Sequence, residues 1–426
     1  MSDNTSPDFI RATSCADDYD PDAMSVDSAR KYIRAFLNPV TLQENQPLRS
    51  TLGRVLAQDI ISPCNVPNHD NSAMDGYALN SADFPQHGLV TLTIAGAAFA
   101  GKPFEGSIKS RECVRIMTGA GIPAGANAVV IQEQVQSNGK QISFSTIPKA
   151  GQNVRRAGED LQLGQVVLPA GHIMRPADLG LIASLGIGEI KVFRRLRVAF
   201  FSTGDELASI GNTLKSGQVY DSNRYTLYGM LARMGVDVVD LGMVPDDPTL
   251  LEQTLLDASS NVDVILTSGG VSVGEADYMK QLLNQLGQVV FWKISLKPGR
   301  PLAYGKIGNA HYFGLPGNPV AVMVTFYQFV REALLVLMGR PNPAPLPLLS
   351  VTCTEPLKKA SGRTEFQRGI LYPDANGIWL VRPTGNQGSG ILRSMSEANC
   401  FIVLPEHCGN VGAGETVQVQ ILEGLI

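Results

Sequence analysis

The 426-residue sequence is poor in charge and in cysteine. Charged residues make up 17% of the chain, against a typical ~25%, and the net charge is −4. This balance excludes a general attraction to nucleic acid or to an acidic membrane. The six cysteines contain no CxxC pair, which argues against a structural zinc site and a disulfide framework and fits a reducing cytosol. Residues 1–21 lack the apolar segment of a secretory signal, so we expect a disordered tail over 1–23 and a cytoplasmic protein.

Long apolar runs are also scarce. The most membrane-like stretch is 320–338, with Pro319 before it and Gly339 after it, as at the start and end of one helix. Arg331 and Glu332 interrupt it, and charge is expensive in the middle of a bilayer. The pattern predicts a helix packed inside a domain, without a membrane partner.

The length argues for several domains, because single cores stop growing at ~250–300 residues. Forty-three glycines and 26 prolines indicate many turns and short strands. Helical spacing predicts helices over 22–37, capped by Ser25, and over 176–185. Between them, runs split by glycines predict the strands of a small β domain: 90–95, 128–132 and 141–144.

From residue 196 the pattern changes to short β-branched runs alternating with amphipathic stretches. The runs are 198–201, 236–240, 262–266 and 289–292, with helices over 224–233 and 250–258. Such alternation is typical of βαβ units and predicts a parallel sheet covered on both faces. Proline-rich 341–347 then marks a boundary. Five further runs predict a small closed sheet: 348–354, 369–372, 378–382, 400–404 and 416–422.

Polar loops follow the predicted strands of the α/β region, where ligands of such sheets bind. These loops contain the acids Glu206, Asp246 and Asp277 and the amines Lys293 and Lys297. Taken singly, each loop could simply cap a helix. Together they gather three acidic loops, two lysines and two glycine loops at one rim, which favours a binding site.

Carboxylates beside lysines suit a phosphorylated substrate held with Mg²⁺, the lysines offsetting phosphate charge. Ser268-Gly269-Gly270 lets main-chain N–H groups approach an anion. The loop is neither GxGxxG nor GxxxxGK[ST], so a Rossmann dehydrogenase and a P-loop ATPase are not supported. The five histidines lie in unrelated contexts, and no Ser-His-Asp arrangement is evident.

Three polar motifs lie outside this region: 70–78, 115–120 and 155–160. The first could be an Asx-rich turn, and the third a solvated loop.

With these motifs the sequence closely resembles the MoeA family of molybdopterin molybdenumtransferases, which are also similar to the E domain of gephyrin. The matching motifs are 70–78, 115–121, 155–160, 203–207, 221–223, 268–278, 297–299, 315–319, 366–369 and 387–389. The resemblance covers about 24–421, and so many ordered motifs make chance agreement improbable.

The resemblance implies an α/β plus β fold with several domains and an elongated homodimer. A three-layer, parallel-sheet molybdopterin-binding domain would occupy 196–340. A small β domain, 66–154, would be inserted into a bent N-terminal domain formed by 24–65 and 155–195. A β-barrel-like domain would occupy 346–426.

The resemblance also implies an activity. Members take adenylylated molybdopterin and molybdate, insert molybdenum at the dithiolene with Mg²⁺ as helper, and release AMP. Glu206, Asp246 and Asp277 would manage the metal and the nucleotide phosphates, and Lys293 and Lys297 would bind molybdate or the pyrophosphate link. Asp75, Thr118, Arg155 and Asp160 would reach the site across the dimer. Further substrate contacts would come from Asp221, Ser222, Gly269, Gly270, Ser272, Gly274, Pro298, Pro316, Gly317, Asn318, Arg368 and Ser389.

Two other functions compete with this transferase. A gephyrin-like scaffold without enzymatic activity could lose the acidic residues of these loops. All three acids and both lysines of the rim are present, which favours the enzyme. The related adenylyltransferase step would need only one domain of the α/β type. Other proteins of molybdenum cofactor biosynthesis are further possible partners.

Overall fold

The computed structural model describes residues 23–84, 88–146, 148–270, 276–340 and 342–422. The chain divides into two compact units. One consists of Met1–Glu44 and Phe193–Ile426, and the other of Asn45–Val192. Each unit is described by itself.

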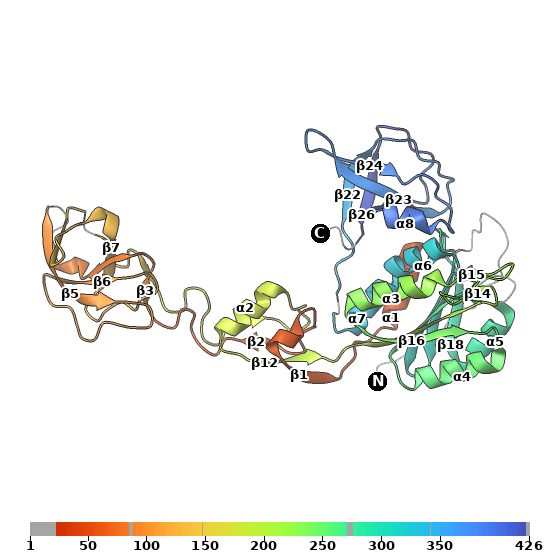
Figure 1. The fold of residues 1–426 in the computed structure, drawn as a ribbon, viewed down its shortest axis with the longest axis horizontal. Coiled ribbons are helices and arrows are strands. Elements are labelled where there is room, and N and C mark those ends of the chain that lie inside the picture. The colour runs from red at the N-terminus through yellow and green to blue at the C-terminus, as the bar shows by residue number, and fades with distance from the viewer. Residues whose placement is uncertain (1–22, 85–87, 147, 271–275, 341, 423–426) are drawn as a thin grey trace, which may run out of the picture. The chain divides into compact units, whose positions relative to one another are not determined.

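A mixed sheet forms the centre of the α/β region in the first unit (Figure 1). In spatial order its strands are β16 (Asp237–Val244), β13 (Arg197–Thr203), β17 (Val264–Ser268), β21 (Ala310–Leu315), β20 (Pro301–Ile307) and β18 (Gly287–Lys293). The first four are parallel, whereas β20 is antiparallel to both β21 and β18. The expectation of a wholly parallel sheet therefore needs correction at β20. Only Gly308 and Asn309 separate β20 from β21, and so short a connection can join only antiparallel strands.

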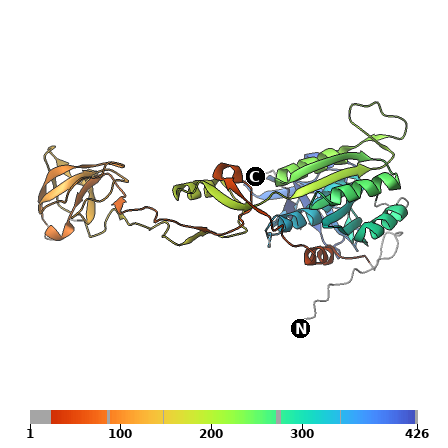
Figure 2. The same ribbon diagram turned by 90° about the horizontal axis from the view of Figure 1, so that it is seen from below.

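Helices cover both faces of this sheet (Figures 1 and 2). They are α1 (Val26–Ala35), α3 (Ser222–Met234), α4 (Pro248–Ser259), α5 (Ala276–Leu286), α6 (Pro319–Thr325) and α7 (Arg331–Leu337). Neighbouring residues of a strand point to opposite faces. Phe200 of β13 accordingly packs in a core with α1, α3, α6 and α7, while Phe201 packs in a second core with α4 and α5. The predicted three-layer domain is confirmed.

α6 and α7 are joined by a π-helical turn, η4 (Phe326–Val330), into one helix, Pro319–Leu337. Within the described ranges it is the one helix long and apolar enough to cross a membrane, and 78% of its apolar 18-residue window is buried inside the structure. The predicted helix packed inside a domain is confirmed.

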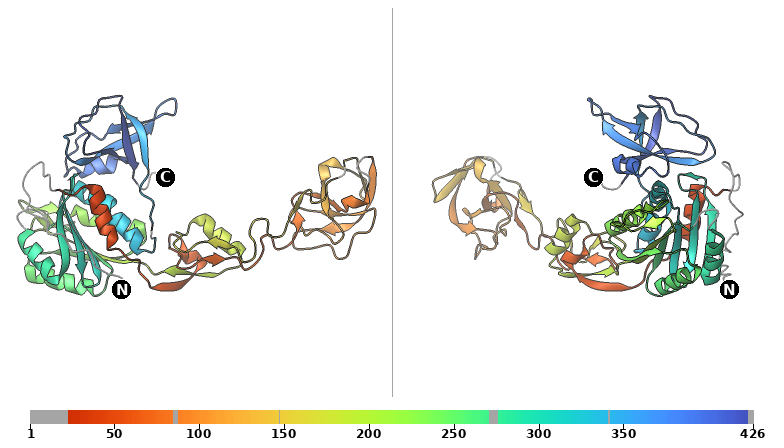
Figure 3. Two further views of the ribbon diagram at one scale, coloured as in Figure 1. Left: turned by 180° about the vertical axis from the view of Figure 1, so that it is seen from behind. Right: turned by 45° about the vertical axis from the view of Figure 1, so that its right-hand side comes forward.

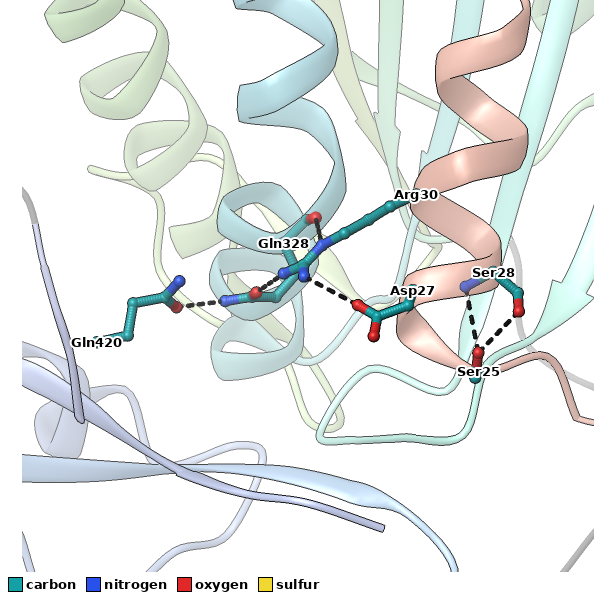
Figure 4. Close-up of polar contacts among 6 residues, drawn as sticks. All are labelled: Ser25, Asp27, Ser28, Arg30, Gln328 and Gln420. Carbon is teal, nitrogen blue, oxygen red and sulfur yellow. Dashed lines mark hydrogen bonds and ion pairs between the residues drawn. The ribbon is translucent and has the colours of Figure 1, made fainter. Parts of the chain in front are cut away.

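A partly buried polar network links this helix to α1 and to the C-terminal strands (Figure 4). Arg30 of α1 donates from Nε to the main-chain oxygen of Gln328 (3.0 Å), and its Nη2 donates to the side-chain oxygen of the same residue. Gln328 in turn donates from Nε2 to Oε1 of Gln420 (2.7 Å). Burial lowers the pKa of Arg30. Three segments far apart in sequence are thereby joined at the π-helical turn.

The C-terminal strands form a closed barrel, coloured blue in Figure 3. They are β22 (Leu348–Cys353), β23 (Thr364–Pro373), β24 (Trp379–Pro383), β25 (Cys400–Leu404) and β26 (Thr416–Ile421), with the short helix α8 (Leu392–Glu397). The order is β23-β24-β22-β26-β25, and pairing of β25 with β23 closes the ring. All five predicted strands and the closed sheet are confirmed. The short strand β19 (Leu296–Lys297) of the α/β region adds to β23 in parallel.

The second unit contains a two-sided sheet with the order β7-β4-β6-β5-β9-β8. Its strands are β4 (Gly76–Leu79), β5 (Val90–Ala98), β6 (Glu112–Ile116), β7 (Ala128–Ile131), β8 (Gln136–Ser137) and β9 (Gln141–Phe144). Tyr77 and Leu79 face one core, and Ala78 faces another. A further core surrounds α2 (Pro176–Ser184), next to the pair β2 (Ile60–Ile61) and β11 (Val166–Leu168). The boundaries predicted within this unit stay predictions.

Two short strand pairs and three 3₁₀ turns complete the second unit and its ends. β3 (Asn71–Ser72) pairs with β10 (Val154–Arg155), and β1 (Gln43–Pro47) pairs with β12 (Glu189–Phe193). Single 3₁₀ turns occur at Leu48–Thr51, Ser81–Asp83 and Gln132–Gln134. In the first unit, β14 (Leu207–Ala208) pairs with β15 (Val219–Tyr220).

Candidate active site

Five strands of the α/β sheet end at one edge. β13, β16, β17 and β21 are parallel, and β18 runs with them because both it and β21 are antiparallel to β20. The loops singled out in the sequence follow these five ends. The topology therefore brings the predicted loops to one rim, on the side where α/β sheets bind ligands.

At this rim two neighbouring acids have different environments. Asp246, after β16, accepts a hydrogen bond from the hydroxyl of Thr203 at the end of β13. Asp247 instead caps α4, accepting from the main-chain N–H three residues on (3.0 Å). Glu206 folds over Gly204, where an added Cβ would lie 2.6 Å from the carboxylate oxygen. Asp246 and Glu206 thus both approach the end of β13, whereas Asp247 belongs to a helix start.

Asp221 is a buried carboxylate, and only one of its two oxygens accepts hydrogen bonds from the described residues. Its Oδ1 accepts from the main-chain N–H of Arg224 (3.1 Å), which caps α3, and from the hydroxyl of Ser202 (3.1 Å). The residue is 3% exposed, and Oδ2 has no partner within the described residues. Ser222 follows as the first residue of α3. A buried carboxylate oxygen without a partner is costly, so a ligand donor at this position would be strongly favoured.

Asn223 joins three loops of the rim. Its Nδ2 donates to the hydroxyl of Ser268, the last residue of β17 (2.8 Å), and to the main-chain oxygen of Gly317 after β21 (2.6 Å). In the same loop Pro316 is buried, and Asn318 immediately precedes α6. The Oδ1 atom of Asn223 is buried and has no partner in the described part of the chain. Asn223 and Asp221 therefore place two buried acceptors at the start of α3.

The glycine loop after β17 approaches the β13 main chain closely. Gly269 has φ +94°, and a Cβ on it would lie 2.2 Å from the carbonyl oxygen of Thr203. Gly270 also has a positive φ, +68°. Only glycine fits such a contact in this conformation. Ser272 and Gly274 lie outside the described residues, as does the side chain of Asp277, whose backbone belongs to α5.

The two predicted lysines differ in position. Lys293 is the last residue of β18 and is half-buried. Lys297 lies in β19, and its Nζ forms an ion pair with Oε1 of Glu365 in the barrel (3.1 Å). Pro298, which follows, is buried. The lysines thus lie on different elements, one of which is bound to the C-terminal barrel.

Arg368 is a buried cation whose partners are neutral. It is 1% exposed, and its guanidinium donates to the hydroxyl of Ser394 (3.0 Å) and to the main-chain oxygen of Gly388 (3.0 Å). Burial lowers its pKa to about 10, so it remains charged at neutral pH. Ser389, in the same loop, accepts at its main-chain oxygen from the N–H of Val320 in the first turn of α6 (3.1 Å). The barrel loop beside Arg368 therefore adjoins a helix that begins at the rim.

The second unit holds the remaining predicted residues. Oδ1 of Asp75 accepts from both the main-chain N–H (2.7 Å) and the hydroxyl (2.8 Å) of Thr118, and these bonds hold the pKa of Asp75 below its ordinary value. Arg155 lies in β10 and Asp160 is exposed on the following loop.

A further ion pair of this unit was not predicted. Arg156 binds Asp70 (2.6 Å), and Asp70 also accepts from the N–H of Ala157 (2.8 Å). The bond from Ala157 and the bond from Arg156 lower the pKa of Asp70. Two of the sequence motifs are therefore joined directly.

A cavity of about 430 Å³ lies elsewhere, between α1, η4, the proline-rich connector and the barrel. None of the predicted site residues lines it. Its lining includes Arg30, Tyr327 and Phe366.

Comparison with known proteins decides the family. The chain matches family models described as the MoeA N-terminal region (domain I and II) over 24–186, a probable molybdopterin binding domain over 199–336 and the MoeA C-terminal region (domain IV) over 350–422. A molybdopterin molybdenumtransferase from Haemophilus influenzae is 47% identical over 404 residues, which cover 95% of this chain and 100% of the relative. The chain belongs to the MoeA family of molybdopterin molybdenumtransferases.

Other relatives agree with membership of the MoeA family. The crystal structure of a molybdopterin biosynthesis MoeA protein from Pyrococcus horikoshii superposes with a TM-score of 0.82 at 29% identity, covering 94% of this chain and 100% of that one. A gephyrin from Dictyostelium discoideum is 33% identical, over 89% of this chain and 59% of its own length. The family predicted from the motifs is thereby confirmed.

For this MoeA-family chain, sequence reasoning missed two polar residues at the rim. Asn223 stood within a matching motif, but nothing in its type showed that it joins three loops. Glu365 precedes another motif, and its contact with Lys297 depends on the docking of the barrel. Only the pairing of β19 with β23 reveals that contact.

The residues present fit Mg²⁺ in chemistry. Glu206 and Asp246 supply carboxylate oxygens, the ligands that Mg²⁺ prefers, and both approach the end of β13. Among the described side chains, no group of three His, Cys, Asp or Glu residues could hold a metal by itself. Mg²⁺ in proteins commonly keeps several waters and substrate phosphates as further ligands, so two carboxylates are compatible with it.

Proposed function

We propose that the chain acts as a molybdopterin molybdenumtransferase in molybdenum cofactor biosynthesis. It takes adenylylated molybdopterin and molybdate, inserts molybdenum at the dithiolene, and releases AMP. The observation that carries the assignment is the rim itself, in a chain 47% identical to a relative of that name. At this rim Asp221 and Asn223 have buried acceptor oxygens, and Asn223 binds the main chain of the loop after β21.

The proposed substrate would make complementary contacts at the rim. The free oxygens of Asp221 and Asn223 would accept hydrogen bonds from N–H or O–H groups of the substrate. The glycine main chain at Gly269 and Gly270 would approach its phosphates, and Lys293 and Lys297 would offset their charge. Arg368 would add a cation from the barrel. Together these groups orient the phosphoanhydride and neutralise charge, which is what its cleavage requires.

The attacking group in this proposal comes from the substrates. Molybdate is an anionic oxygen nucleophile, so no covalent intermediate on a side chain is needed. Glu206, Asp246 and Asp277 would hold Mg²⁺, which supplies Lewis-acid polarisation of phosphate oxygens when bound. The protein's own contribution is to hold the reacting oxygens in line and to keep the charged loops at fixed positions.

The second unit would complete the site in a homodimer. Asp75, Thr118, Arg155 and Asp160 are polar residues of that unit, and we propose that each protomer presents them to the rim of its partner. Mixing two inactive variants tests this. Asp75→Ala mixed with Asp277→Ala should regain about a quarter of the wild-type rate, the share of intact sites in randomly mixed dimers. No regain would place all these residues in one protomer's site or deny them a role.

AMP release tests the activity itself. Purified protein with adenylylated molybdopterin, Mg²⁺ and molybdate should release AMP, and Asp277→Ala should abolish release and molybdenum insertion while keeping the fold. Asp257→Ala, an exposed acid near the far end of α4, is the matched control and should keep full activity. Normal activity of Asp277→Ala would refute the metal assignment. If wild type released no AMP at any molybdate concentration, a gephyrin-like scaffold would be the better function.

Cytoplasmic location is part of the same proposal.

A further inference from the structure

A buried glutamate of the barrel holds one lysine of the rim. Glu365 of β23 has a side chain that is 3% exposed, whereas the side chain of its partner Lys297 is 48% exposed. Their Oε1 and Nζ atoms lie 3.1 Å apart. The pair therefore consists of a fixed, buried acid and an amine that still reaches solvent.

Main-chain pairing places Lys297 and Glu365 opposite each other on neighbouring strands. β19 pairs with β23 in parallel, and Lys297 stands directly opposite Glu365. The N–H of Thr364 donates to the carbonyl oxygen of Ser295 (2.9 Å), which adds a second main-chain link. The ion pair thus rests on strand pairing and does not depend on two long side chains meeting across solvent.

The second oxygen of Glu365 is also occupied. Gln367 donates from Nε2 to Oε2 (3.2 Å) and to the main-chain oxygen of Lys358 (2.9 Å). With one donor on each oxygen, the carboxylate has a defined orientation. Lys297 is therefore bound in a defined direction too.

Other cations lie near this acid. Lys359 is buried and donates from Nζ to the main-chain oxygen of Ala360 (2.9 Å). Burial lowers the pKa of Lys359; Glu365 opposes that shift, while Lys297 and Arg363 add to it. Without Glu365, Lys297 would face like charges and would be pushed away from its present position.

We propose that Glu365 is the positioning residue of Lys297, so that the barrel determines where this amine meets an anionic substrate. The inference rests on the proposed function, because it assumes that Lys297 contacts adenylylated molybdopterin or molybdate. A free lysine loses side-chain entropy when it is fixed on a ligand. Glu365 reduces that loss by restraining the amine before the substrate binds.

Two substitutions of Glu365 separate position from charge. Glu365→Gln removes a negative charge, so a purely electrostatic role predicts tighter binding of an anionic substrate. A positioning role predicts the reverse, with KM for adenylylated molybdopterin raised roughly tenfold. Glu365→Asp keeps the charge but shortens the side chain, and it should also raise KM. Unchanged KM in Glu365→Asp, or a lower KM in Glu365→Gln, would overturn the proposal.

A double-mutant cycle with Lys297→Met identifies the residue through which Glu365 acts. In the Lys297→Met background Glu365→Gln should change KM less than twofold, because the amine it positions is gone. Additive effects would overturn the proposal. If Lys297→Met alone left KM and kcat unchanged, the role of Lys297 in the proposed function would be wrong instead. Glu397→Gln, which breaks the exposed pair with Arg393 (2.6 Å) in the same barrel, is the control and should leave KM unchanged.

Discussion

Thr203, the last residue of β13, donates its hydroxyl to Asp246, which follows the neighbouring strand β16. The bond fixes one carboxylate of the rim from an adjacent strand end. The acid next to it, Asp247, is used to start α4. Two consecutive aspartates in one loop therefore have separable tasks.

This separation predicts opposite phenotypes. Asp246→Ala should reduce AMP release by at least about 100-fold, as expected when a site carboxylate is lost. Asp247→Ala should lower the free energy of unfolding by about 1 kcal/mol through loss of the helix cap, with AMP release near normal. Denaturant unfolding and AMP assays on both variants check this. Equal losses of activity in the two would contradict it.

Gly269 should not tolerate a side chain. In Gly269→Ala the new Cβ would meet the carbonyl oxygen of Thr203 at 2.2 Å, and φ +94° is strained for alanine. Because a displacement of about 1 Å in a site can cost ~100-fold in rate, AMP release should fall by about that factor. Gly229→Ala, on the exposed side of α3, is the control, since no atom lies within 4 Å of its added Cβ, and it should lose less than threefold. Wild-type kinetics for Gly269→Ala would show that the loop relaxes freely.

The buried guanidinium of Arg368 should lower the free energy of unfolding relative to an apolar side chain at the same position. Its buried guanidinium has only neutral partners among the described residues, and exchange of such a cation for an apolar side chain is often neutral or stabilising. Arg368→Met should therefore leave the unfolding free energy unchanged or raise it by about 1 kcal/mol, while KM for adenylylated molybdopterin rises at least tenfold. Thermal unfolding and AMP assays test both parts. A destabilised variant with normal KM would show a purely structural arginine.

His311 should make stability depend on pH. It is buried between β17 and β20, where its Nδ1 lies 3.2 Å from the hydroxyl of Tyr304, and burial lowers its pKa from 6.5 to about 4. Lys306 also lowers this pKa, and Asp263 acts against it. The unfolded chain therefore binds a proton between pH 6.5 and 4 that the folded chain does not.

The sign follows from that difference. As pH falls from about 6.5 to 4, His311 should reduce the unfolding free energy by up to about 1.4 kcal/mol per pH unit. His311→Gln removes this contribution, so its stability should fall less steeply over the same range. Urea unfolding at several pH values measures both slopes. Parallel curves for the two proteins would contradict the assignment.

Much of the α/β region could be predicted because its strands are short β-branched runs between amphipathic helices. β20 was missed because residues 301–307 begin with proline, which is disfavoured at most strand positions, and include Gly305 in the strand interior. Local pattern carries no information on such pairings as β19 with β23, which depend on how two regions pack. For the same reason the acids and lysines of the rim were predictable, but the contact between Lys297 and Glu365 was not.

The sequence also left open which rim acids cap helices and which face the site. Both Asp246 and Asp247 precede α4, and an aspartate at either position could cap the helix. The hydroxyl of Thr203 decides between them, and that hydroxyl comes from a strand more than forty positions away. Site residues of this kind are recognised by partners that lie far off in the chain.

Closure of the barrel has a consequence for the order in which the protein folds. β22, the first barrel strand, pairs with β26, the last, and β23 must reach β25 to complete the ring. Such pairings between distant segments form slowly, because the chain must close long loops before they stabilise anything. The helix-rich α/β region can form earlier. The barrel would be among the last parts of the chain to become native. The ion pair between Lys297 and Glu365 would therefore form late in folding.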